Sequence, residues 1–86
     1  MNKTRFTRNH LIQEIKKLND ILEQKNHEYR FVTGGRYNKS AIDLATPEQV
    51  KRHTCSINLA LGTPKQCLNE CMDYMTRNRI DYQIIV

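Results

Sequence analysis

The segment Thr54–Met75, TCSINLALGTPKQCLNECMDYM, changes from a strand pattern to a helix pattern within a few residues. In its first part, apolar side chains alternate with smaller or polar ones, which is the period of a half-buried β-strand. The apolar positions of this alternation are Cys55, Ile57, Leu59 and Leu61. The pattern predicts a strand at about 54–61, and Gly62 allows a tight exit from it.

A helix start follows at once in the run Thr63-Pro64-Lys65-Gln66. Thr63 is a good N-cap, Pro64 suits the first helical position, and Gln66 can reach back to the Thr63 amide. The apolar residues that come next fall on one helical face, namely Cys67, Leu68, Cys71, Met72 and Met75. We therefore expect a helix at about 64–79.

The first eight residues carry Lys3, Arg5 and Arg8, and we interpret residues 1–8 as a flexible basic arm. From Asn9 the pattern becomes helical, with Thr7 or Asn9 as the cap. The apolar stripe of this segment consists of Leu11, Ile15, Leu18 and Leu22. Its spacing predicts a helix at about 9–26 that packs one face against a core.

Residues 28–45 have the pattern of a β-hairpin with arms at about 28–34 and 40–45. Gly34-Gly35 is the stronger turn signal because glycine accepts positive φ without steric cost, and Asn38-Lys39-Ser40 is the alternative turn. The segment 46–53 repeats the Thr-Pro-x-Gln helix start with little apolar character. We expect a short helical turn or a structured loop there.

The order of helix, three strands and helix predicts an α+β domain. Strands joined by a hairpin form an antiparallel sheet, and both amphipathic helices should cover one face of it. A chain of 86 residues suffices for one small domain, here 9–86. The last residues, Ile80–Val86, alternate well enough for a possible fourth strand that pairs at the sheet edge or with a second chain.

Membrane and secretory signals are missing from the sequence. No apolar run approaches the roughly 18 residues of a membrane span, and no apolar stretch follows the basic N-terminus. An odd number of cysteines, three, also argues against a disulfide framework. We therefore expect no membrane partner and a cytoplasmic location.

Zinc binding is the alternative use of the cysteines, with His53, Cys55, Cys67 and Cys71 as candidate ligands. Their spacing is that of a strand and a helix rather than of a tight zinc knuckle, so we interpret all three cysteines as buried core thiols. A core position for Cys55 also removes the one neighbouring pair of base and nucleophile, His53 with Cys55. We predict no catalytic residues, no metal and no cofactor, and hence a protein that is not an enzyme.

Positive charge is the remaining functional signal. The net charge is +5, and no acidic residue occurs in 1–13, 29–42 or 49–69. Basic loops with an interleaved aromatic residue can bind a phosphate backbone and stack a base. The candidate nucleic-acid-binding residues are Arg36, Tyr37, Lys39, Lys51, Arg52 and Lys65.

The five cationic candidates are predicted to form one patch at one end of the sheet. In an antiparallel sheet, the hairpin turn shares an end with the exit of the third strand, where Lys65 begins the last helix. The free amides of that helix start also favour an anion. The first function hypothesis is therefore a small non-enzymatic binding protein that contacts nucleic-acid phosphates. The second is a protein-interaction module or a small homodimer that uses the apolar strand Ile84-Ile85-Val86.

Two resemblances to known proteins concern the layout. The order of elements, with Leu18-Asn19-Asp20 and Gly62-Thr63-Pro64-Lys65 in its helices, resembles a double-stranded-RNA-binding domain. That family carries several lysines where only Lys65 stands here, and a Gly-Pro-x-His loop where this chain has Gly34-Gly35-Arg36-Tyr37. This resemblance implies an arrangement of elements and no RNA-binding residues.

The second resemblance is to small uncharacterised α+β proteins of bacterial mobile elements and phages. It is carried by Leu18-Asn19, by the hairpin from Arg36-Tyr37-Asn38 into Ala41-Ile42-Asp43-Leu44, and by the helix start Gly62-Thr63-Pro64-Lys65-Gln66. This resemblance implies no activity.

Overall fold

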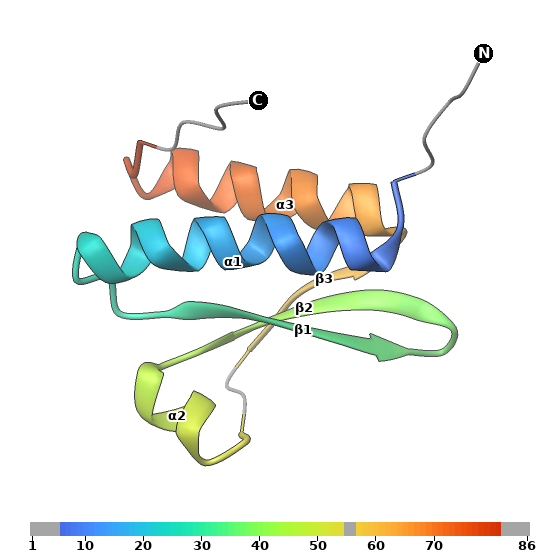
Figure 1. Ribbon diagram of the computed structural model, residues 1–86, viewed down its shortest axis with the longest axis horizontal. Coiled ribbons are helices and arrows are strands. Elements are labelled where there is room, and N and C mark those ends of the chain that lie inside the picture. Colours follow the sequence, from blue (N-terminus) through green and yellow to red (C-terminus); the bar gives the residue numbers. More distant parts are fainter. Residues whose placement is uncertain (1–5, 55–56, 82–86) are drawn as a thin grey trace.

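The computed structural model describes residues 6–54 and 57–81, which form a two-layered α+β domain (Figure 1). Two long helices cover one face of a three-stranded antiparallel sheet, and a short helix lies beyond one end of the sheet. The elements in chain order are α1 (Arg8–Gln24), β1 (Arg30–Arg36), β2 (Lys39–Ala45), α2 (Pro47–Lys51), β3 (Ile57–Gly62) and α3 (Pro64–Arg77). The predicted fold class is confirmed.

All three helices begin with the same pair of side-chain hydrogen bonds. A threonine N-cap accepts from the backbone N–H three residues later, and the side chain of that later residue accepts from the threonine N–H. The pairs are Thr7 with His10, Thr46 with Gln49 and Thr63 with Gln66. Because Thr7 and not Asn9 is the cap, α1 starts at Arg8, one residue before its predicted start.

The three helices also end alike. The residue after each C-cap is in the left-handed region, with φ of 54° at Asn26, 57° at His53 and 57° at Arg79. The next N–H then reaches back to the last turn in a Schellman arrangement. After α3 this bond runs from the Ile80 N–H to the Met75 carbonyl at 2.9 Å, and Ile80 is buried. α1 and α3 therefore end at Gln24 and Arg77, two residues earlier than the periodicity predicted.

The turn between β1 and β2 corrects the sequence prediction. β1 continues through both glycines to Arg36, and the two turn residues are Tyr37 and Asn38, with φ of 52° and 61°. Two positive φ values at a two-residue loop define a type I′ turn. Gly34-Gly35 is not the turn, since neither glycine has positive φ. Of the alternative turn, only Asn38 takes part, because β2 already starts at Lys39.

β2 is the central strand, between β1 and β3. The β2–β3 register shifts between Ile42 and Asp43, because Ala60 pairs with Ile42 whereas Asn58 pairs with Asp43. The Asn58 amide donates to Asp43 Oδ1 at 3.0 Å and to the Ala60 carbonyl at 3.2 Å. This bulge adds one residue to β3 and bends that edge strand.

The outer edge of β1 is tied to α1 by one side chain. Asn19 Nδ2 donates to the Phe31 carbonyl at 2.9 Å, and Asn19 Oδ1 accepts from the Phe31 N–H at 2.8 Å. Both backbone groups of Phe31 are thereby satisfied from the helix, so an incoming strand cannot pair with them at this point.

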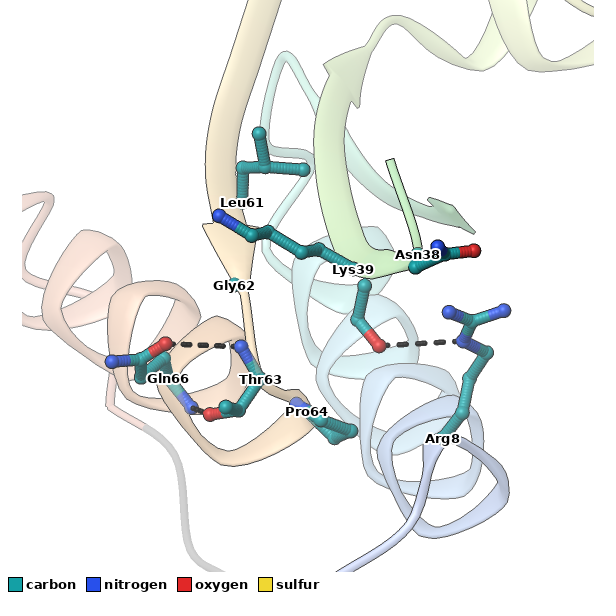
Figure 2. A pocket seen from close by; sticks show the side chains of 9 residues that line it. Arg8, Asn38, Lys39, Leu61, Gly62, Thr63, Pro64 and Gln66 are labelled. Atoms are coloured by element: carbon teal, nitrogen blue, oxygen red, sulfur yellow. Dashed lines mark hydrogen bonds between the residues drawn. The ribbon is translucent and has the colours of Figure 1, made fainter. Parts of the chain in front are cut away.

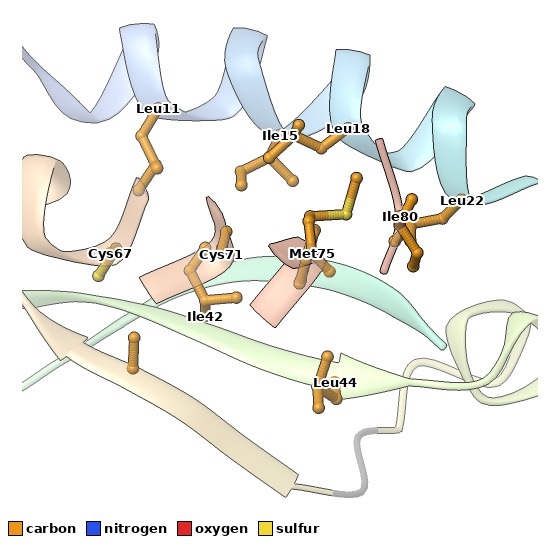
Figure 3. Close-up of a cluster of buried hydrophobic side chains, with 12 residues drawn as sticks. Leu11, Ile15, Leu18, Leu22, Ile42, Leu44, Cys67, Cys71, Met75 and Ile80 are labelled. Carbon is orange, nitrogen blue, oxygen red and sulfur yellow. The ribbon is translucent and has the colours of Figure 1, made fainter. Parts of the chain in front are cut away.

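The core lies between the two long helices and the sheet (Figure 3). Its fully buried members come from α1, the central strand and α3, and the seven largest are Leu11, Leu18, Leu22, Ile42, Cys67, Cys71 and Met75. The apolar stripes predicted for both helices point inward. Cys67 and Cys71 are confirmed as buried free thiols, and Cys55 lies outside the described residues.

Both ends of the chain bear on earlier predictions. Phe6 packs against the core and Thr7 caps α1, so residues 6–8 belong to the domain and not to a flexible arm. Residues 1–5 lie outside the described residues. Of the possible fourth strand, Ile80 is buried below α3, and residues 82–86 lie outside the described part of the chain. No helix in the described ranges combines the length and the apolar character needed to span a membrane.

Candidate nucleic-acid interface

Three segments that are far apart in sequence meet at one end of the sheet. The hairpin turn lies there because Arg36 pairs with Lys39 at the end of the β1–β2 ladder. The exit of β3 lies beside it because Ser40 pairs with Gly62. The first turns of α1 and α3 come to the same end (Figure 1). We call this region, with the side chains of Arg8, Lys39 and Lys65, the basic end.

A pocket of about 560 Å³ opens at the basic end (Figure 2). Its lining residues come from α1, the start of β2, the exit of β3 and the start of α3, and they are Arg8, Asn38, Lys39, Ser40, Leu61, Gly62, Thr63, Pro64 and Gln66. Arg8 and Lys39 are the charged residues of this lining, and neither Asp nor Glu contributes to it. The first turns of α1 and α3 also contain no acidic residue. An anion in this pocket would meet two cations and no lining carboxylate.

Arg8 is exposed and contacts the sheet. Its Nε donates to Ser40 Oγ at 3.3 Å, and Ser40 is buried. Arg8 Nη1 lies 3.2 Å from the point where a Cβ on Gly35 would stand. A Cβ at Gly35 would therefore press on the guanidinium, which is the far end of a flexible side chain and would have to shift by a few tenths of an ångström.

Arg8 is a site residue that was not predicted from the sequence, because residues 1–8 were interpreted as a flexible arm. The signal that could have found it was the Thr-x-x-His spacing of Thr7 and His10. A histidine at that position reaches back to the cap, with His10 Nδ1 3.0 Å from the Thr7 N–H. That pairing favours Thr7 over Asn9 as the cap and places Arg8 at the first helical position, inside the domain.

The start of α3 contributes less to anion binding than the sequence predicted. The Thr63 N–H donates to Gln66 Oε1 at 2.9 Å, and the Gln66 N–H donates to Thr63 Oγ1 at 3.2 Å (Figure 2). Pro64 has no N–H. Within residues 63–66, only the Lys65 amide is left for a ligand. An anion at this end would therefore be attracted by the side chains of Arg8, Lys39 and Lys65 rather than by the helix amides.

Four of the six candidate residues lie at the basic end. Tyr37 is at the tip of the hairpin with 85% of its surface exposed, and Lys39 lines the pocket. Lys65 is exposed in the first turn of α3, and Arg36 is the last residue of β1.

Lys51 and Arg52 do not join this group, so the prediction of a single patch of five cations was wrong. They follow β2, and the end of β2 lies at the opposite end of an antiparallel strand from the hairpin turn. Lys51 lies there in a shallow pocket whose lining includes Asp20 and Glu23. Arg52 Nη2 is 3.1 Å from Glu48 Oε1 on the surface. Arg52 therefore has a carboxylate partner, and Lys51 shares its pocket lining with two carboxylates and with Arg30.

The residues considered for metal binding or catalysis do not form a described site. His53 is exposed and has φ of 57° after the C-cap of α2, so it terminates a helix, and Cys55 lies outside the described residues. Cys67 is buried with its Sγ 3.3 Å from the Ser40 carbonyl oxygen. Burial raises the pKa of the Cys67 thiol, and burial raises that of Cys71 strongly. Within the described ranges, no group of three or more His, Cys, Asp or Glu side chains could hold a metal ion.

Comparison of the chain with family models, with curated proteins and with solved structures gave no match.

Proposed function

We propose that this chain is a small non-enzymatic binding protein whose basic end contacts the phosphates of a nucleic acid. The observation that carries the proposal is the pocket of about 560 Å³ whose charged lining residues, Arg8 and Lys39, are both cationic. Lys65 adds a third charge next to the lining residue Pro64. Each cation that meets a phosphate releases a condensed counterion, so three cations make a salt-dependent binding site.

The proposal includes a cytoplasmic location. Cys67 and Cys71 are free thiols, and thiols stay reduced in that compartment.

The test is the binding of a fluorescently labelled single-stranded oligonucleotide of mixed sequence, measured by anisotropy at several salt concentrations. Three phosphate contacts predict that log Kd rises with log salt with a slope of about 2. Lys39→Glu should weaken binding about tenfold for all sequences and reduce that slope by about 1. Lys65→Glu should act in the same direction.

Lys51→Glu is the matched control, because it makes the same change in charge at the other end of the sheet. It should change Kd by less than about twofold. Absence of binding at about 50 mM salt would overturn the proposal. Equal losses from Lys39→Glu and Lys51→Glu would overturn it as well, because they would show a response to net charge and not to the basic end.

Protein interaction through β3 is the second candidate function. β3 is an edge strand, and its Ile57 and Leu61 are 51% and 43% exposed. Exposed apolar edge strands pair with other chains. Sedimentation of the full chain and of a chain ending at Ile80 tests the docking strand Ile84-Ile85-Val86. Two monomers of equal stability would exclude that strand as the partner of β3.

A further inference from the structure

The tip of the β1–β2 hairpin carries a residue that its turn does not favour. Type I′ turns take Asn-Gly or similar pairs, because both positions need positive φ. Here the first position is Tyr37, with φ of 52°, and a bulky residue at positive φ is a conformational outlier. The ring gains nothing from packing to offset this strain, since 85% of the residue is exposed. Among the exposed large apolar side chains of the described residues, it is the most exposed.

The surroundings of Tyr37 are suited to a nucleotide. A second depression of about 250 Å³ is lined by Arg8, Gly35, Tyr37, Asn38 and Lys39. It adjoins the larger pocket, because Arg8, Asn38 and Lys39 line both. One aromatic side chain, one amide and two cations therefore surround the same small space.

The backbone brings these groups together before any ligand binds. The turn is only two residues long and is closed by the Arg36–Lys39 pair, so the backbone confines Tyr37 to the hairpin tip. Arg8 contacts the sheet beside it through its hydrogen bond to Ser40. A ligand can therefore meet the aromatic ring and the cations in one depression without a rearrangement of the backbone.

We propose that Tyr37 stacks on an unpaired base while Arg8 and Lys39 contact the adjoining phosphates, so that the basic end selects single-stranded nucleic acid. This inference rests on the proposed function and specifies its substrate class. The faces of duplex bases are covered by their neighbours, whereas a single strand can present a base to an exposed ring. Stacking tolerates any base, because every base has a π-face.

The experiment compares three labelled ligands of equal length, measured by anisotropy at about 50 mM salt. They are a strand of about 12 thymidines, an abasic strand with the same number of phosphates, and a duplex. The wild-type chain should bind the thymidine strand about tenfold more tightly than the abasic strand and the duplex.

Tyr37→Gly should weaken binding without destabilising the fold. Glycine accepts the positive φ, so this variant should melt about 4 °C higher than the wild type. It should also bind the thymidine strand about tenfold more weakly and bind the abasic strand unchanged. Tyr37→Phe keeps the ring and should bind as the wild type does. Asn38→Gly relaxes the same turn, keeps Tyr37, and should retain the preference for the thymidine strand.

Two results would overturn the inference while leaving phosphate binding in place. One is equal affinity of the wild type for the thymidine and abasic strands. The other is an equal loss of both ligands in Tyr37→Gly, which would show that the substitution disturbs the cations and not a stack. Absence of binding to all three ligands would overturn the proposed function itself, and the inference with it.

Discussion

One asparagine side chain satisfies backbone groups at the edge of the sheet. Asn19 exchanges two hydrogen bonds, of 2.9 and 2.8 Å, with the backbone of Phe31 on the free edge of β1. The Asn19 side chain is only partly buried. The two backbone groups that it satisfies belong to the core residue Phe31 and would otherwise lack this partner. A polar residue within an amphipathic helix thus stabilises a neighbouring strand.

Removal of this amide should be costly. Asn19→Ala should lower the free energy of unfolding by about 2 kcal/mol, because two hydrogen bonds disappear and the Phe31 groups lose their partner. Urea denaturation followed by circular dichroism measures this change. Asn69→Ala, at an exposed position of α3, is the control and should cost less than about 0.5 kcal/mol. A loss as large in the control would contradict the role of Asn19.

Because the residue after the C-cap of α3 is left-handed, glycine should stabilise the fold there and destabilise it two residues earlier. Arg79 has φ of 57° and is exposed, so Arg79→Gly should stabilise the fold by about 1 kcal/mol. Arg77 ends the helix proper, and Arg77→Gly should destabilise the fold by a similar amount, about 1 kcal/mol. Thermal melting of both variants checks the signs. A lower melting point for Arg79→Gly would be incompatible with this account of the helix end.

At the scale of elements, the end of α1 is joined to α3 by a polar contact. His27 Nε2 and the Tyr74 hydroxyl share a hydrogen bond of 2.7 Å, and the Tyr74 ring also meets Phe31 edge-on. Burial, with the Arg30 guanidinium as a second cause, holds the pKa of His27 below its ordinary value of 6.5. Glu28 acts in the opposite direction but does not reverse the shift.

This contact makes stability depend on pH. In the window from 6.5 down to the lowered pKa, the unfolded chain binds more protons at His27 than the folded chain does. The contribution of His27 is therefore complete above pH 6.5 and is lost as the pH falls below it. Denaturation of His27→Gln at a series of pH values above about 5.5, where ordinary carboxylates are more than nine-tenths ionised, should show a flatter slope than the wild type. A slope in His27→Gln as steep as that of the wild type would contradict this role of His27.

Local rules account for what could be predicted at this scale. Apolar periodicity identified both long helices, and the Thr-Pro-x-Gln spacing correctly indicated the starts of α2 and α3. The hairpin turn was not predicted, because glycine propensity favoured Gly34-Gly35 whereas β1 continues through both glycines. Gly35 lies instead against the guanidinium of Arg8, a residue 27 positions away. Contacts between distant segments are invisible to local patterns.

The candidate site was predictable only to the same degree. Hairpin topology brought Lys39 and Lys65 to one end of the sheet, as the sequence indicated. The short helix after β2 kept Lys51 and Arg52 at the other end, and Arg8 was not included because residues 1–8 were interpreted as a flexible arm. The prediction of a single patch was wrong for Lys51 and Arg52. Nothing in the sequence determined which end of the sheet residues 46–53 would reach.

At the scale of the whole molecule, the core depends on both long helices staying on the sheet. Cys67 and Cys71 belong to α3, have no exposed surface and are part of the core between the helices and the sheet. Burial raises the pKa of both thiols, so the reactive thiolate is disfavoured as well as covered. Their chemical protection therefore reports on the integrity of the fold.

Thiol labelling should follow global unfolding. In a Cys55→Ser background, native protein should resist alkylation at Cys67 and Cys71 and should become labelled at the urea concentration that unfolds the sheet. Mass spectrometry of the alkylated chain, compared with the circular dichroism transition, measures this. Alkylation in native buffer at the rate of a small free thiol would show that α3 opens locally.

The separation of charge between the two ends of the sheet has a consequence for motion in solution. At one end, Arg8 and Lys39 line a pocket without carboxylates, and Lys65 lies beside it. At the other end, Asp20, Glu23 and Glu48 lie among the cations. Such a distribution is an electric dipole, and the field of a polyanion exerts a torque on it before contact. The molecule should therefore arrive with its hairpin tip foremost, and its association rate should exceed that of a randomly oriented body of equal net charge.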